Sequence, residues 1–332
     1  MAHGKLVGWM VAAVLSVAVS AVAQPVDQVT LPRLLEGGGF KPPKQFKALV
    51  LKLDDKGAVI AAYDTGGSSE HRDDWWPASC VKLFAATAAL EKTKALGLTP
   101  KARGTWLYGS GPKTLTVEQV VRRALTPSDN KAYDMLVELV GFDDLNGRFF
   151  TPRNGFSKTV LLRAYSGRVK DPETNTTTTR HSPPIELVEG GRTVKVPERA
   201  GKRQFDCPEE GNCTTLRELA ENLRRVMMHE KLPEDQRFAL GAVELKLLRS
   251  AMSAKRSRGN GVLDGLRRGF GDVKIQTWSK PGYAREWFSD VVFVKRGDTG
   301  ERFIVSMAGW PGRSALDEAA EHVGRLLATR KL

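Results

Sequence analysis

Ser79 and Lys82 are the pair of residues in this sequence best suited to nucleophilic chemistry. They lie three apart at the start of an Ala- and Leu-rich run, and residues three apart share one face of a helix. Lys82 is the only charged residue between Asp74 and Glu91, so a helix here would bury its amine among apolar side chains. Burial lowers the pKa of a lysine, and a neutral amine can take the proton of a serine hydroxyl. Free backbone N–H groups at the helix N-terminus could stabilise an oxyanion beside Ser79.

The Ser-x-x-Lys spacing is common and carries little weight alone. Two further copies occur, at Ser110–Lys113 and Ser128–Lys131. The first contains Gly and Pro, which disfavour a helix, and neither opens a long apolar run. The copy that begins at Ser79 is therefore the one that predicts a catalytic pair.

Ser128-Asp129-Asn130 lies directly before a predicted helix. Such polar residues commonly cap a helix, and this structural role is one interpretation. The functional alternative makes Ser128 a proton relay that faces Lys82, and Asn130 an amide that orients the lysine or a substrate.

Lys280-Pro281-Gly282 follows a predicted strand directly. Lys280 at the strand end could place a positive charge against an anionic substrate. Gly282 would let the backbone approach another group closely, because glycine has no side chain.

Several other kinds of site are disfavoured by the motifs that are missing. The chain has five histidines, with no His-Glu-x-x-His and no Cys-x-x-Cys, so we expect no metal site. Gly-x-Ser-x-Gly and the two glycine-rich phosphate loops are also missing. We expect no cofactor.

In this order, Ser-x-x-Lys, Ser-Asp-Asn and Lys-x-Gly resemble the motifs of the penicillin-recognising serine enzymes, namely class A β-lactamases and low-molecular-weight penicillin-binding proteins. The resemblance covers most of the chain after residue 23. It implies acyl transfer through a covalent ester. The roles that it implies are nucleophile for Ser79, base for Lys82, proton shuttle for Ser128, substrate contact for Asn130 and electrostatic anchor for Lys280. It also implies an oxyanion hole made by the N–H of Ser79 and that of Tyr283, just beyond Gly282.

Two departures from the family pattern bear on activity. Pro281 stands where the family usually has Thr or Ser, so the hydroxyl and the N–H at that position are lost. Arg285 could supply a cation nearby, although a surface role is the simpler interpretation. The Glu-x-x-Leu-Asn segment whose glutamate activates the deacylating water is also missing. Glu173 and Glu186 lie in the corresponding region, but we interpret both as solvated loop carboxylates and expect slow hydrolysis of the ester.

The order of the predicted strands and helices that must position these residues indicates an α+β fold. Strands are expected over 46–53, 58–63, 273–279, 287–295 and 302–308, and helices over 79–98, 117–125, 131–140, 215–230, 233–252 and 314–329. This order predicts one antiparallel sheet built from both termini, with an inserted helical lobe. The sheet lobe would comprise about 24–75 and 255–332, and the helical lobe about 79–250. A Thr-, Pro- and Gly-rich insertion at about 166–212 is expected to lack regular structure.

The first 23 residues resemble a secretory signal peptide. Lys5 precedes an apolar run over 7–22, and Ala21-Val22-Ala23 forms a small-x-small site for cleavage before Gln24. We therefore expect a periplasmic or secreted protein with no membrane span in the mature chain. Cys207 and Cys213 could close a small disulfide loop in that oxidising compartment. Cys80 is expected to be a buried, inert thiol.

Composition is that of a folded protein, with 41% hydrophobic and 27% charged residues. The net charge of +13 includes a denser basic stretch over 249–268 that has no aromatic residue until Phe270. We therefore expect a solvated basic face and no nucleic-acid partner. We expect a monomer that acts on a small-molecule or peptidoglycan-derived amide. Three functions stay open: a β-lactamase-like hydrolase, a peptidoglycan D,D-peptidase, and a non-catalytic envelope-binding protein.

Overall fold

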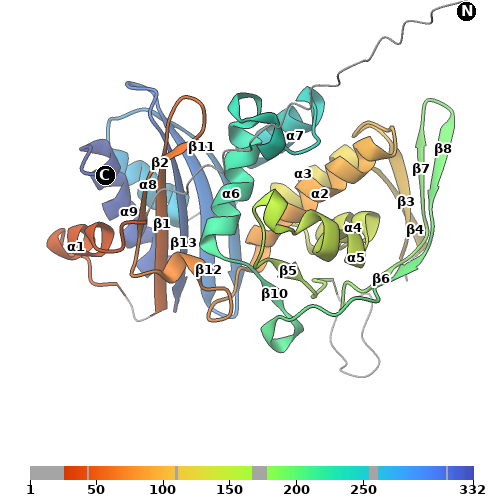
Figure 1. Cartoon of the computed structure of the whole chain (residues 1–332), viewed down its shortest axis with the longest axis horizontal. Helices are drawn as coiled ribbons and strands as arrows, with labels where there is room; N and C mark the ends of the chain where they lie inside the picture. Colours follow the sequence, from red (N-terminus) through yellow and green to blue (C-terminus); the bar gives the residue numbers. More distant parts are fainter. Residues whose placement is uncertain (1–25, 43–44, 109–110, 167–177, 254–260, 312) are drawn as a thin grey trace, which may run out of the picture.

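The computed structural model describes residues 26–42, 45–108, 111–166, 178–253, 261–311 and 313–332. Its centre is an antiparallel sheet with strand order β11-β12-β13-β1-β2 (Figure 1). The strands are β1 (Gln45–Leu53), β2 (Val59–Asp64), β11 (Ile275–Ala284), β12 (Trp287–Arg296) and β13 (Arg302–Trp310). Strands from the two ends of the chain meet where β1 pairs with β13. This arrangement confirms the α+β class and the sheet built from both termini.

Side chains alternate across the sheet, so each face packs against its own helices. On β1, Val50 belongs to the cluster that holds α1 (Thr30–Gly37), α8 (Gly261–Phe270) and α9 (Arg313–Ala328) against one face. Leu49 and Leu51 belong to the larger core on the opposite face. In Figure 1, α1, α8 and α9 lie on one side of the sheet and the helical lobe lies on the other.

The helical lobe surrounds α2 (Lys82–Ala95), whose first nine residues, 82–90, are all buried. Its other helices are α3 (Val117–Leu125), α4 (Asn130–Val140), α5 (Phe142–Asp144), α6 (Leu216–Met227) and α7 (Ala242–Ser253). A capping box at Thr116 begins α3, and the side chain of Thr215 caps α6. These helices agree with the sequence predictions except at 233–252, where α7 begins only at Ala242.

A second sheet, with order β4-β3-β7-β8, projects from the helical lobe (Figure 1). It pairs β3 (Arg103–Tyr108) and β4 (Gly111–Thr116) with β7 (Ile185–Glu189) and β8 (Arg192–Val196). The prediction that 166–212 lacks regular structure is wrong for its described part, 178–212. Gly190 and Gly191, both at positive φ, form the turn between β7 and β8, and Ile185 and Leu187 alternate inward.

Two-residue strands complete the helical lobe. They form the pairs β5 (Val160–Leu161) with β10 (Asn212–Cys213), and β6 (His181–Ser182) with β9 (Arg199–Ala200). A disulfide joins Cys207 to Cys213, which confirms the loop that their spacing indicated. Cys80 is fully buried, as expected.

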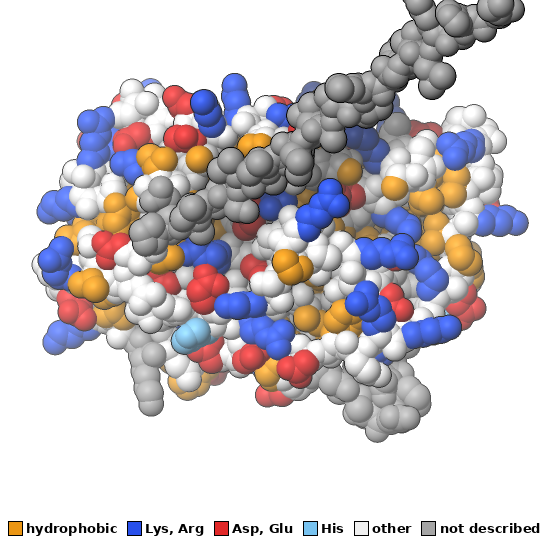
Figure 2. All heavy atoms as spheres, viewed as in Figure 1, with side chains coloured by type: hydrophobic (Ala, Val, Ile, Leu, Met, Phe, Trp, Pro, Cys, Tyr) orange, Lys and Arg blue, Asp and Glu red, His pale blue; other side chains and the backbone are white. Residues whose placement is uncertain are grey.

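The basic residues of 249–268 that the structure describes are engaged in ion pairs. Arg249 pairs with Glu230, and Arg268 pairs with both Asp317 and Glu321. Figure 2 shows lysine and arginine side chains interspersed with carboxylates over the face in view.

The expected signal peptide, residues 1–23, lies outside the described residues. Within the described ranges, no helix is both long and apolar enough to cross a bilayer.

Candidate active site

Ser79 lies in a single 3₁₀ turn, Ala78–Val81, that leads directly into α2. Ala78 adopts φ 47°, a left-handed conformation that is strained for a residue with a side chain. The hydroxyl of Tyr165 donates to the carbonyl of Ala78 at 2.7 Å and holds this conformation in place. The prediction of a helix starting at Ser79 is therefore correct to within one turn.

β11 presses against this turn from the other lobe. A Cβ built on Gly282 would lie 2.5 Å from Pro77 O and 2.8 Å from Ser79 N, so only glycine fits. The hydroxyl of Ser289, the β12 partner of Gly282, donates to Pro77 O at 3.1 Å. The thiol of Cys80 donates to Lys280 O at 3.0 Å. The Ala78–Val81 turn holds Ser79, the nucleophile predicted from the sequence, and is called the nucleophile turn below. Direct contacts thus join it to the strand that contains Lys280.

The Lys82 amine is fully buried and points to the loop before α4. Its Nζ donates to Ser128 O at 2.5 Å, to Asn130 Oδ1 at 2.7 Å and to Ser128 Oγ at 3.2 Å. The ring of Tyr165 lies 5.6 Å from the same Nζ. Among the described hydrogen bonds, none involves the Ser79 hydroxyl.

Burial is the main reason why the pKa of Lys82 falls to about 8, because the ammonium form loses its hydration. The carboxylates of Asp129 and Asp134 oppose this shift and keep it from being larger. A substantial fraction of Lys82 is consequently neutral near pH 8, in the range where a lysine can act as a base.

Lys280 brings a second buried amine to the same hydroxyl. Its Nζ donates to Ser128 Oγ at 2.8 Å and to Pro281 O at 2.8 Å. We predicted that Lys280 lies at the end of a strand. In the structure it lies inside β11. The strand continues through Pro281 because β11 is at the edge of the sheet, where a missing backbone donor costs little.

Ser128 reaches these amines from a loop that its neighbour stabilises. Ser128 has φ 64°, and the side chain of Asp129 caps α4 by accepting from the N–H groups of Lys131 and Ala132. The capping role and the relay position thus fall to adjacent residues. Asn130, the first residue of α4, is itself exposed.

Two residues at the site had no sequence signal. Tyr165 contacts both Lys82 and Ala78, and Asp134 accepts from the N–H groups of Tyr165 and Ser166 at 2.8 Å each. Asp134 lies inside an ordinary helical pattern and Tyr165 ends an apolar run, so only the three-dimensional fold brings them together.

The two glutamates considered for deacylation do not enter the described site. Glu173 lies outside the described residues, and Glu186 is exposed on β7, where it faces Thr105 of β3. Tyr283 follows Gly282 in β11, and its side chain is 64% exposed.

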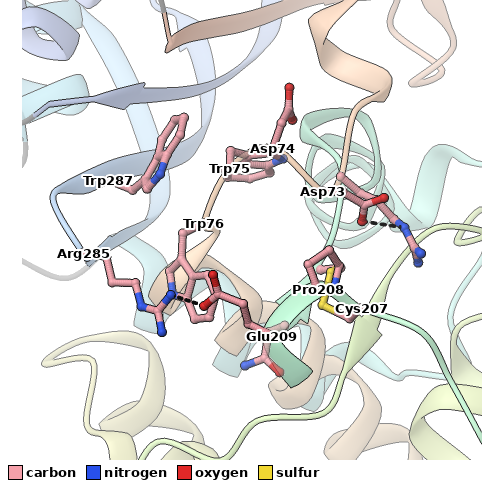
Figure 3. A pocket seen from close by; sticks show the side chains of 12 residues that line it. Asp73, Asp74, Trp75, Trp76, Cys207, Pro208, Glu209, Arg285 and Trp287 are labelled. Atoms are coloured by element: carbon pink, nitrogen blue, oxygen red, sulfur yellow. Dashed lines mark hydrogen bonds and ion pairs between the residues drawn. A yellow bond between two sulfur atoms is a disulfide. The ribbon is translucent and has the colours of Figure 1, made fainter.

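A pocket of about 210 Å³ is lined by residues close in sequence to Ser79 and Gly282 (Figure 3). Its wall includes Trp76, three residues before Ser79, and Arg285, three residues after Gly282. Arg285 is half-exposed, as expected of a surface residue, but its guanidinium lies 4.6 Å from the Trp76 ring and pairs with Glu209. Glu209 lies in the disulfide loop, so this loop contacts the rim of the site.

Comparison with known proteins agrees with this geometry. The β-lactamase enzyme family matches residues 44–327, which is most of the chain. The chain belongs to this family. It is accordingly a serine hydrolase of the class A β-lactamase-like superfamily, which confirms the resemblance drawn from the three motifs.

Solved structures show the same fold for this family member. A variant of PBP-A, solved as an acyl-enzyme complex with penicillin G, has a TM-score of 0.60 at 16% identity and covers 94% of this chain and 100% of its own. A class A β-lactamase from Bacteroides cellulosilyticus has a TM-score of 0.57 at 14% identity, covering 90% and 96%. A β-lactamase from Burkholderia vietnamiensis has a TM-score of 0.58 at 13% identity and covers 95% of this chain and 98% of its own. No curated protein matches the sequence.

Proposed function

We propose that this family member is an exported hydrolase that forms an acyl-enzyme on Ser79 and binds β-lactams. The observation that carries the proposal is the state of the Lys82 amine. This amine is fully buried and donates a hydrogen bond to Ser128, and its pKa is lowered to about 8. A buried lysine of this kind is costly for stability and is typical of a catalytic base.

In the proposed reaction, neutral Lys82 takes the Ser79 hydroxyl proton while Ser79 Oγ attacks the amide carbonyl. The N–H groups of Ser79 and Tyr283 would stabilise the oxyanion. As the carbon–nitrogen bond breaks, the proton passes through Ser128 to the leaving nitrogen. Water then hydrolyses the ester and regenerates the Ser79 hydroxyl. Lys280 and Asn130 would orient the substrate.

Deacylation is proposed to be slow. The carboxylates beside Lys82 in the described part of the chain have other roles: Asp129 caps α4, and Asp134 holds Tyr165 and Ser166. Neither is available to activate water. Pro281 also lacks the hydroxyl that the family pattern offers to a substrate carboxylate. Binding of that carboxylate would therefore depend more on cationic side chains.

Intact-mass analysis over time after addition of penicillin G tests the proposal. We expect an adduct equal to the mass of the penicillin, persisting for minutes or longer, and no adduct on the Ser79→Ala variant. An adduct that forms equally on Ser79→Ala, or none on either protein, would overturn the mechanism. In the second case, unchanged binding of Ser79→Ala to purified cell wall would favour a non-catalytic envelope-binding role.

A D,D-peptidase is the second candidate, favoured by the lack of a Glu-x-x-Leu-Asn segment in the sequence. Release of D-alanine from a pentapeptide, lost in Ser79→Ala, would distinguish it from a β-lactamase-like hydrolase. We further propose that the chain is exported to the periplasm or secreted as a monomer. An N-terminus at Gln24 in the exported protein, and a monomeric mass in solution, are the expected results.

A further inference from the structure

The pocket lined by Trp76 and Arg285 contains side chains that have no role in the proposed reaction. Its walls come from three separate segments: 72–76 before Ser79, the disulfide loop 207–213, and the turn that contains Arg285 and Trp287 (Figure 3). A chain of three residues spans at most about 11 Å, so the Cα atoms of Trp76, which lines the pocket, and Ser79 lie within that distance of each other. A group bound here could therefore belong to a molecule that also reaches Ser79.

The three indoles of the pocket are not equivalent. Trp75 is 5% exposed and its N–H donates to His71 O at 3.0 Å. Two guanidinium groups lie on the Trp76 ring, that of Arg285 at 4.6 Å and that of Arg163 at 5.3 Å from its centroid. Trp287 is only partly buried, and within the described ranges no ring or cation is stacked on it. Trp287 also packs against the hydrophobic core, so its exposed part is the indole surface that the pocket can offer to a ligand.

The charged groups of the pocket are of both signs and are already paired. Arg72 pairs with Asp73 at 3.0 Å, Lys47 pairs with Asp74 at 2.6 Å, and Arg285 pairs with Glu209. An ion of either sign would meet repulsion as well as attraction at such a surface. A wholly apolar group would strip water from carboxylates that are about half exposed, which is costly.

A neutral ring with several hydroxyl groups meets neither objection. Its hydroxyls can donate to Asp73 and Glu209 and accept from Arg72, while its C–H face packs on the electron-rich face of Trp287. The pocket volume of about 210 Å³ lies below the usual range of about 300–1,000 Å³ for drug-sized ligands, and suits one ring.

We propose that this pocket binds one pyranose ring of an oligosaccharide. The further step, that this ring is part of the substrate and the scissile amide is carried on a glycan, rests on the proposed function. On this basis the substrate class is a glycan-linked peptide, and a free β-lactam would occupy only the Ser79 side.

The experiment uses the full exported chain with Ser79→Ala, so that binding is measured without turnover. Tri-N-acetylchitotriose is titrated while tryptophan fluorescence and saturation-transfer NMR are recorded. We expect saturable binding and a loss of at least about tenfold in affinity, or about 1.4 kcal/mol, when Trp287→Ala is added. Trp310→Ala is the matched control, because Trp310 is 39% exposed at the end of β13 and does not line the pocket.

Asp73→Asn provides a second variant in case Trp287→Ala does not fold, since Asp73 is about half exposed. It should weaken trisaccharide binding severalfold with an unchanged melting temperature. Absence of saturable binding, or equal weakening by Trp310→Ala, would overturn the inference. Because penicillin adduct formation on the protein with Ser79 intact is a separate measurement, failure of the saccharide site and failure of the proposed function are distinguishable.

Discussion

Lys82 and Lys280 donate to one hydroxyl oxygen, Ser128 Oγ, from 3.2 Å and 2.8 Å respectively. Two ammonium groups that share one small oxygen repel each other, so the arrangement favours one neutral amine. Burial lowers the pKa of Lys82 to about 8, so this amine can lose its proton near neutral pH. Ser128 thus lies between Lys280 and the proposed base Lys82, the position that its proposed role as proton relay requires.

The rate of Ser79 acylation should follow the titration of Lys82. Below its pKa of about 8 the inactive ammonium form dominates, so the rate should rise up to about tenfold per pH unit from pH 6 and level off above about pH 9. Single-turnover acylation by a chromogenic β-lactam between pH 6 and 10 measures this profile. A rate that is constant across the range would contradict the assignment of Lys82 as base.

The same pKa predicts a cost in stability. The folded state disfavours the Lys82 ammonium, so between the folded pKa of about 8 and the unfolded value of about 10.4 the unfolded chain binds more protons, and stability rises with pH. Lys82→Met should abolish acylation and stabilise the protein at pH 7 by roughly 1–3 kcal/mol. Chemical denaturation at pH 7 and pH 10 tests this, because the advantage of the variant should shrink at the higher pH. A pH-independent difference would count against the shifted pKa.

The Ser128 hydroxyl can be separated from the Ser128 backbone by two substitutions. Ser128→Ala and Ser128→Gly both remove the relay, and each should lower the acylation rate roughly 10²- to 10³-fold. Ser128 has φ 64°, so the Gly variant should be the more stable of the two by up to about 1 kcal/mol. Acylation rates and melting temperatures measured together check both effects. Near-normal acylation in both variants would exclude Ser128 as the relay.

The sequence predicted the sheet and the central helices well, for physical reasons. The predominantly apolar runs over 46–53 and 287–295 indicate strands buried on both faces, and Ser79 followed by an apolar run indicates a buried helix. Contacts between distant segments leave no such signal. The stacking of Arg285 on Trp76 and the hydrogen bond from Tyr165 to Ala78 depend on tertiary approach, so these contacts emerged only with the fold.

Two predictions made from the local sequence pattern were wrong, because the general rules behind them have exceptions. The predicted strand ended at residue 279, two residues before Pro281, but an edge strand tolerates proline and β11 continues to Ala284. The composition of 166–212 indicated an irregular loop, yet the Gly190-Gly191 turn joins two strands that pair against the helical lobe. Edge position and pairing between segments distant in sequence are properties of the whole sheet, and a single segment does not encode them.

Gly282 should be intolerant of any side chain. In Gly282→Ala the new Cβ would meet Pro77 O at 2.5 Å and Ser79 N at 2.8 Å, so the strand or the nucleophile turn must move. Since an ångström of misplacement can cost about 10²-fold in rate, acylation should fall by at least that much. Gly37→Ala is the matched control, because no atom lies within 4 Å of a Cβ built there. Equal acylation rates in the two variants would show that the close approach is unimportant.

Tyr165 should act as a positioning residue for both members of the Ser79–Lys82 pair. Tyr165→Phe keeps the ring near Lys82 but removes the donor to Ala78 O, leaving that carbonyl next to a strained φ without its partner. Loss of one such buried bond costs about 1–3 kcal/mol, and acylation should slow roughly tenfold. The pH midpoint of acylation should stay near 8 in Tyr165→Phe, because the ring that buries Lys82 remains. Tyr165→Leu also opens space around the amine, so its midpoint should move upward as water reaches Lys82. Identical pH profiles for the two variants would mean that the ring does not set the surroundings of the base.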